Sequence, residues 1–211
     1  MNASAKALVA VAALVSLAPL LRAAPVVWPT NGHVYEVRSR PEGVDWLTAQ
    51  TECVATGGYL ATLTTEAEND FVFGLVASVP SVWRWGPLES FGLGPWIGGR
   101  QEESAPEPDS GWYWSETGEP WGYENWAPGE PNDGLPNEDF AHFYSGQSGV
   151  LIGNYWNDAP GDSLCRGYVY ESDGWTAVAE PDSDGAQLPA ESSWSWIKAL
   201  HLPQVYLPSP N

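Results

Sequence analysis

The chain has 211 residues, which is enough for one domain with a sizeable core. It holds 27 acidic and 8 basic residues, a formal net charge of −19, so nucleic acids and anionic membrane surfaces are poor partners and cations are favourable ones. The same acidity keeps a protein soluble, so much of the charged surface needs no further explanation.

The N-terminal residues have the layout of a secretory signal peptide. Lys6 precedes an apolar run over residues 7–21, and small residues follow it. A membrane anchor is the alternative, but Pro19 interrupts the run, which is also short for a bilayer span of about 20 residues. We therefore expect residues 1–23 to be a signal peptide and residues 24–32 a linker. The mature chain is then secreted or periplasmic and does not insert into a membrane.

The next segment predicts a strand, a helix and a second strand. Residues 33–39 alternate between apolar and polar side chains, which is typical of a strand. Asp45 is placed to cap a helix whose apolar residues recur with helical spacing until Gly57 and Gly58 end it. Residues 59–63 then predict a short strand.

A second helix follows, and after it the pattern changes. Thr65 and Glu68 have the spacing of a capping box, and the apolar stripe after them stops before Pro80. Residues 116–138 have almost no regular period, and a structureless segment of that length in a compact domain is usually functional. Further short strands are predicted at residues 96–99, 111–115, 139–145, 153–158 and 166–171.

These elements predict an α+β domain over residues 33–171, with two helices early, short antiparallel sheets late and one long loop region between them. Residues 172–211 are rich in Asp, Ser, Pro and Ala, and we expect them to form an acidic tail of uncertain order.

The stretch NWAPGEPNDGLPNEDF, residues 125–140, gathers carboxylate and carboxamide side chains between prolines and glycines. Carboxylates repel one another, and a metal ion is the simplest way to hold them together. Zinc and copper favour nitrogen and sulfur ligands, whereas calcium (Ca²⁺) takes six to eight oxygens, so calcium is the expected metal. The alternative is that Glu130 and Asn132 are ordinary turn residues and Glu138 faces solvent.

Several separate motifs, in order, resemble the C-type lectin-like domain. GEPWGYENWAPGEPND is followed by NEDF, YWNDAPGDS and GYVYE, while WLTAQTECVATGGYLATLTTEAENDFVFGL is similar to the two-helix opening of that family and WIGG to its core strand motif. Each motif alone is weak, but the ordered set is specific. The chain is identified as a secreted, bacterial-type member with Glu-Pro-Asn and Trp-Asn-Asp motifs. The resemblance implies the C-type lectin-like fold with its long calcium-binding loop region.

The resemblance also implies the ligands of one calcium ion that binds sugar as well. It implies a cis peptide before Pro131, which places the flanking side chains on the same side. Two neighbouring sugar hydroxyls would replace water on the calcium, with glutamates accepting their protons and asparagine amides donating to their lone pairs. The implied metal ligands are Glu130, Asn132, Glu138, Asn157 and Asp158, and the first four of these are also the implied sugar-binding residues.

A secreted, calcium-dependent carbohydrate-binding protein is therefore the expected function. In this family a Glu-Pro-Asn order accompanies mannose-type sugars and a Gln-Pro-Asp order accompanies galactose, so a mannose-type preference is implied. A single shallow site gains useful affinity from several copies, so a multimer is a possible state. A protein-binding or adhesion module in which calcium is only structural is the alternative.

An enzyme is not expected. A glycosidase needs one carboxyl group kept protonated by an apolar pocket opposite an ionised partner, and acids in a proline-rich loop with amide neighbours suit metal coordination better.

The two cysteines, Cys53 and Cys165, can either form a disulfide or remain free thiols. Export would place them in an oxidising compartment where they can pair, yet the family's two usual bridges are not reproduced in this sequence. The sequence leaves a Cys53–Cys165 disulfide and two free thiols equally open. His142 lies in a predicted strand, and we expect it to be a structural histidine rather than a ligand.

Overall fold

The computed structural model of the protein describes residues 23–87, 90–135, 137–146 and 150–174. The chain divides into two compact units, residues 1–173 and 174–211, and the described helices and strands all belong to the first. Almost all of the predicted signal peptide and of the predicted tail lie outside the described residues. Within the described ranges, no helix combines the length and apolar character needed to cross a bilayer.

Two α-helices and one mixed sheet make up the described part of this unit, which confirms the predicted α+β class. In chain order the elements are β1 (Val26–Val27), β2 (Val34–Val44), α1 (Trp46–Val54), β3 (Tyr59–Leu60), α2 (Glu66–Ala77), the 3₁₀ helix η1 (Pro80–Val82), β4 (Arg84–Trp85), β5 (Gly92–Gln101), β6 (Trp112–Trp114), β7 (Phe140–Ser145), β8 (Tyr155–Ala159) and β9 (Cys165–Ser172). The strand order is β1-β2-β9-β5-β7-β8, with β3 on β9 and with β4 and β6 on β5. The pairing is antiparallel except between β5 and β9, which are parallel.

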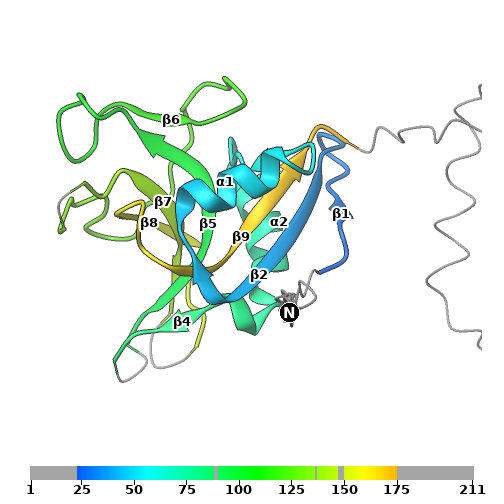
Figure 1. Ribbon diagram of the computed structural model, residues 1–211, viewed down its shortest axis with the longest axis horizontal. Coiled ribbons are helices and arrows are strands. Elements are labelled where there is room, and N and C mark those ends of the chain that lie inside the picture. Colours follow the sequence, from blue (N-terminus) through cyan, green and yellow to red (C-terminus); the bar gives the residue numbers. More distant parts are fainter. Residues whose placement is uncertain (1–22, 88–89, 136, 147–149, 175–211) are drawn as a thin grey trace, which may run out of the picture. The chain divides into compact units, whose positions relative to one another are not determined.

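Strand β9 separates two hydrophobic clusters, because its successive side chains point to opposite faces of the sheet. On one face Tyr168 and Tyr170 pack with Trp46 and Cys53 of α1, while Val169 packs with the apolar side of α2 on the other face. Figure 1 shows α1 in front of β9 and α2 behind the β2–β9 pair. Both helices are therefore held by burial of apolar surface against the same central strand.

Both helices begin at the residues that the sequence predicts. Asp45 accepts a hydrogen bond from the backbone nitrogen of Thr48 at 2.9 Å, and Thr65 accepts one from the backbone nitrogen of Glu68 at 3.2 Å. The second half of the capping box is absent, because the Glu68 carboxylate accepts instead from the backbone nitrogen of Thr64 at 2.7 Å. A tertiary contact explains this difference, as the other oxygen of Glu68 accepts from Tyr35 at 2.6 Å.

A buried carboxylate, Glu171, ties β9 to the segments around it. Its Oε1 lies 2.6 Å from Nδ1 of His33 and 2.9 Å from the hydroxyl of Tyr35, and its Oε2 accepts from the backbone nitrogen of Thr62 at 2.7 Å. Tyr35 also contacts Glu68, so two carboxylates share one hydroxyl group. Burial, reinforced by the charge of Glu68, raises the pKa of Glu171 to about 7.

Residues 24–32, which we expected to be a linker, instead pack in part against the domain. Val26 and Val27 form β1 and pair with β2, and the buried ring of Trp28 stacks on Phe71 with ring centroids 5.9 Å apart. A two-residue strand is too short to show alternation, so this pairing could not be predicted. The segment is held by that apolar ring and belongs to the domain.

Cys53 and Cys165 are free thiols in the structure, and both are buried in the cluster that contains α1. The disulfide that the sequence left open is therefore not formed here. Burial raises the pKa of each thiol above its usual range, which keeps both protonated and unreactive.

We predict that Glu171 makes the domain less stable as the pH rises. Its folded-state pKa of about 7 lies above its ordinary value of 4.5, so its contribution is fully present below pH 4.5 and is lost as the pH rises through 7. The loss amounts to about 3 kcal/mol of unfolding free energy. Urea unfolding at pH 5 and pH 8 measures it.

Glu171→Gln, which mimics the protonated carboxyl group, should lose less stability between these two pH values than the wild type does. The exposed Glu42→Gln serves as the control and should follow the wild type. An unchanged pH dependence in Glu171→Gln would show that this carboxylate is ionised throughout.

Candidate functional site

The long loop is fastened along the edge of β8 that faces away from β7. The backbone nitrogen of Ala127 donates to the carbonyl of Trp156, and the backbone nitrogen of Trp156 donates to the carbonyl of Asn125, both at 2.8 Å. The side chain of Asn125 donates to the carbonyl of Asn154 at 2.9 Å. Aromatic rings in mutual contact fill the space beneath this part of the loop: Trp112, Trp114, Trp121, Trp126 and Trp156. The residues before Glu130 are therefore fixed beside β8.

Asp158 connects the tip of this loop to β8. Its Oδ2 accepts hydrogen bonds from the backbone nitrogens of Asn132 and Asp133, each at 2.9 Å. The peptide bond between Glu130 and Pro131 is cis, as the resemblance implies. The two distant motifs, Glu-Pro-Asn and Trp-Asn-Asp, thus meet in one place.

The other oxygen of Asp158 adds unpaired negative charge to the site. Asp158 is only 1% exposed, and its Oδ1 is buried without a hydrogen-bond partner among the described residues. Glu130 lies close enough for the two carboxyl groups to interact directly. Burial, followed by the charge of Asp158, raises the pKa of Glu130 to about 7. Two neighbouring carboxylates whose charges interact in this way favour a proton or a cation between them.

Asn132 and Glu138 complete the loop side of the site. The Asn132 amide nitrogen contacts Oε2 of Glu130, and the backbone nitrogen of Glu138 lies 3.3 Å from Oδ1 of Asp133. Oδ1 of Asn132 and Oε2 of Glu138 both lie within 3.5 Å of the point where a side chain on Gly134 would begin. Burial raises the pKa of Glu138 as well. Only glycine at this position leaves the space between the two oxygens open.

Asn157 supplies the strand side of the site, where a histidine supports it. Its amide nitrogen contacts the carbonyl oxygen of Asp158 and lies 3.2 Å from Nε2 of His142. The two residues face each other across the β7–β8 pair. His142 is structural, as expected, but its contact with an expected ligand was missed. The contact follows from the register in which β7 pairs with β8, and this register cannot be predicted from the sequence.

All five expected ligand residues therefore lie in one neighbourhood. Among the residues that the structure describes, no three His, Cys, Asp or Glu side chains gather at metal-binding distance. Two of the five expected donors are asparagines, whose amide nitrogens now contact oxygens of their neighbours. The donor set consists of carboxylate and amide oxygens with one buried oxygen unpaired, and this chemistry fits calcium rather than zinc.

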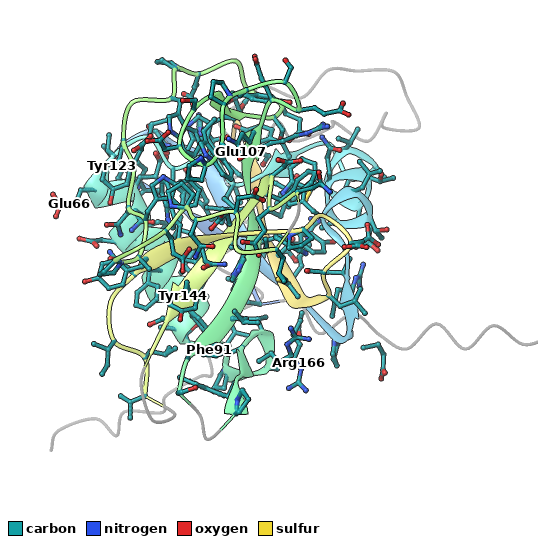
Figure 2. The ribbon with its side chains drawn as sticks, turned by 90° about the vertical axis from the view of Figure 1, so that its left-hand side faces the viewer. Glu66, Phe91, Glu107, Tyr123, Tyr144 and Arg166 are labelled. Atoms are coloured by element: carbon teal, nitrogen blue, oxygen red, sulfur yellow. The ribbon has the colours of Figure 1, made fainter. Side chains whose placement is uncertain are left out.

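A hollow of about 320 Å³ borders this site, and Glu138 and Asn157 form part of its wall. Leu135, which is 58% exposed, lies on its rim. Tyr144 and Phe91, both labelled in Figure 2, line it with stacked rings whose centroids are 6.1 Å apart. A ligand held at Glu138 and Asn157 would therefore have an apolar and aromatic surface beside it.

Known proteins resemble this chain in sequence. No protein-family model matches it. It is 29% identical over 150 residues to a perlucin-like protein of Mytilus galloprovincialis. This match covers 69% of the chain and 83% of that protein. It is 27% identical over 123 residues to the galactose-specific lectin nattectin of Thalassophryne nattereri, spanning 58% of the chain and 62% of that protein.

Solved structures resemble it in fold. The C-type lectin CEL-I of Cucumaria echinata superimposes with a TM-score of 0.51 at 21% identity, covering 68% of this chain and 96% of that one. An EPNH mutant of CEL-I gives a TM-score of 0.52 at 23% identity, covering 68% and 95%. Nattectin and CEL-I are named as lectins, and none of these four names describes an enzyme. The described unit has the C-type lectin-like fold.

Proposed function

We propose that the chain is a secreted, calcium-dependent carbohydrate-binding protein. The observation that carries the proposal is the carboxylate of Asp158: Oδ2 holds the loop, Oδ1 is buried without a donor among the described residues, and the charge of Asp158 raises the pKa of Glu130. A cation there would relieve the repulsion between the two carboxylates. In an extracellular setting calcium is the cation that suits an oxygen-only donor set, with affinities on the order of 10⁻⁴–10⁻³ M.

The sugar would be held by two neighbouring hydroxyls that replace water on the calcium. Glu130 and Glu138, as carboxylates, accept the hydroxyl protons, and the amides of asparagines donate to the remaining lone pairs. The order of acceptor and donor around Pro131 decides which pair of hydroxyls fits. With Glu130 before it and Asn132 after it, we propose a mannose-type preference, although the relative nattectin is named as galactose-specific.

A glycan array with and without chelator tests this proposal. We expect the wild type to bind mannose-type glycans in calcium and to lose this binding when calcium is removed. Glu130→Ala should bind none, since it removes one calcium ligand that is also a sugar acceptor, whereas Glu42→Ala should match the wild type. Calcium uptake without glycan binding would instead favour the protein-binding alternative. Glycan binding that survives chelation would refute the proposed site.

Exchanging the acceptor and donor around Pro131 tests the specificity. In Glu130→Gln/Asn132→Asp, the amide and the carboxylate change places, so the site should favour galactose-type over mannose-type glycans while still requiring calcium. Competition by free mannose and free galactose measures the change. A double variant that binds calcium but keeps the mannose preference would show that other residues select the sugar.

Glu130→Gln alone should make the calcium-free protein more stable, because it removes one of two facing carboxylates. Since Glu130 is partly solvated, the gain is up to about 1 kcal/mol, which corresponds to a rise in melting temperature of about 2–4 °C. The same variant should gain less stability from added calcium than the wild type does. Thermal melts with and without calcium check both statements, with Glu42→Gln as the control. A calcium-free Glu130→Gln that melts below the wild type would contradict the repulsion.

A further inference from the structure

The hollow beside Glu138 and Asn157 is built by segments that are far apart in the sequence. Strands β7 and β8 contribute His142 and Asn157, which face each other in the register of that pair. The long loop contributes Leu135, and the turn between β8 and β9 contributes Leu164. Its volume of about 320 Å³ lies at the lower end of the range for small-ligand pockets, roughly 300–1,000 Å³. The hollow is therefore large enough for part of a small ligand.

Two leucines border this hollow with much of their surface in solvent. Leu135 is 58% exposed and Leu164 is 49% exposed. Leu164 has a fixed place, because it packs on Gly43, where an added side chain would come within 2.8 Å of its Cβ atom. Phe91 and Tyr144, labelled in Figure 2, add a pair of stacked rings to the same wall. A ligand group that covered these side chains would remove apolar surface from water.

The charges of the hollow favour an uncharged occupant. The chain has 27 acidic residues, yet among the described residues that line the hollow Glu138 is the single carboxylate and Arg84 the single arginine or lysine. Depletion of charge around apolar side chains is typical of the centre of a binding surface. The hollow thus differs from the acidic chain as a whole and suits an apolar group.

The hollow and the proposed sugar site share two residues. Glu138 and Asn157 line the hollow and are also expected to contact sugar hydroxyls. A sugar ring held by them lies at the edge of the hollow, so a group attached to that ring can extend across it. An apolar group that does so covers Leu135 and Leu164, whereas a polar group gains more from staying in water.

We propose that the hollow is a second subsite, which binds the alkyl chain of a glycolipid whose sugar is held by the calcium. This inference rests on the proposed function and adds the class of ligand, an amphiphilic glycoconjugate rather than a free polysaccharide. The hydrophobic effect would supply the added affinity, because a single shallow sugar site leaves most of its ligand in water.

Methyl mannoside and hexyl mannoside test the subsite, because they differ only in the length of the alkyl chain. With calcium present, hexyl mannoside should bind the wild type roughly ten- to thirtyfold more tightly, since part of its chain is buried. NMR titration below the micelle concentration measures both affinities. Equal affinities would overturn this inference and leave the proposed function intact. If neither mannoside binds in a calcium-dependent manner, the proposed function fails and this inference fails with it.

Serine substitutions at the two leucines locate the bound chain. In Leu135→Ser and in Leu164→Ser, the ratio of hexyl to methyl affinity should fall at least threefold. Leu47→Ser is the matched control and should keep the wild-type ratio, since Leu47 is 61% exposed on α1 and does not line the hollow. A wild-type ratio in both hollow variants would place the chain elsewhere and refute the subsite. Thermal melts should show all three variants folded, because each of these leucines is exposed.

A probe without sugar tests the hollow alone, in a protein without substitutions. In the calcium-free wild type, 1-hexanol should shift the NMR methyl resonances of Leu135 and Leu164 more than those of Leu47. Equal shifts at the three leucines would show nonspecific contact only and would contradict the subsite. Sedimentation tests a second copy of the chain as the competing occupant. A wild-type dimer that Leu164→Ser abolishes and hexyl mannoside leaves intact would also rule the proposal out.

Discussion

The carboxylate of Asp158 is the constraint on which the site depends, because its two oxygens have opposite roles. Oδ2 accepts from two backbone nitrogens of a loop some 26 residues away and so holds the loop on β8. Oδ1 is buried and lacks a donor among the described residues, and the charge of Asp158 raises the pKa of Glu130. The hydrogen bonds that organise the loop therefore also bring two negative charges together. A proton or a cation would resolve this conflict.

The rest of the domain makes β8 the rigid side of the site. Trp156 is fully buried, and its indole nitrogen donates to Oδ1 of Asn69 on α2 at 2.8 Å. Helix α2 is in turn held against the central sheet by its apolar side and by the Glu68 carboxylate. Asn157 and Asp158 follow Trp156 directly, so their positions are set by the packing of the core. The loop residues, by contrast, reach the site through backbone hydrogen bonds and an exposed turn.

Local signals in the sequence were enough to predict where the two helices begin. The caps at Asp45 and Thr65 depend on neighbouring residues, and the structure has both. The five ligand residues were carried over from the resemblance, and the structure brings them together, although their role remains a proposal. What could not be predicted depends on partners distant in sequence. Glu68 accepts a hydrogen bond from Tyr35 and so does not complete its capping box. Trp28 stacks on Phe71. His142 contacts Asn157 only because β7 pairs with β8 in one register.

In the proposed site, the choice of sugar depends on the loop. Glu130 and Asn132 would provide the acceptor and donor that distinguish one arrangement of hydroxyls from another, and both lie on the loop side of the site. Calcium that ordered this loop would also order the sugar contacts, and by linkage a bound sugar would strengthen calcium binding by the same factor. The rigid strand would thus set where the ion binds, while the loop would set which sugar can join it.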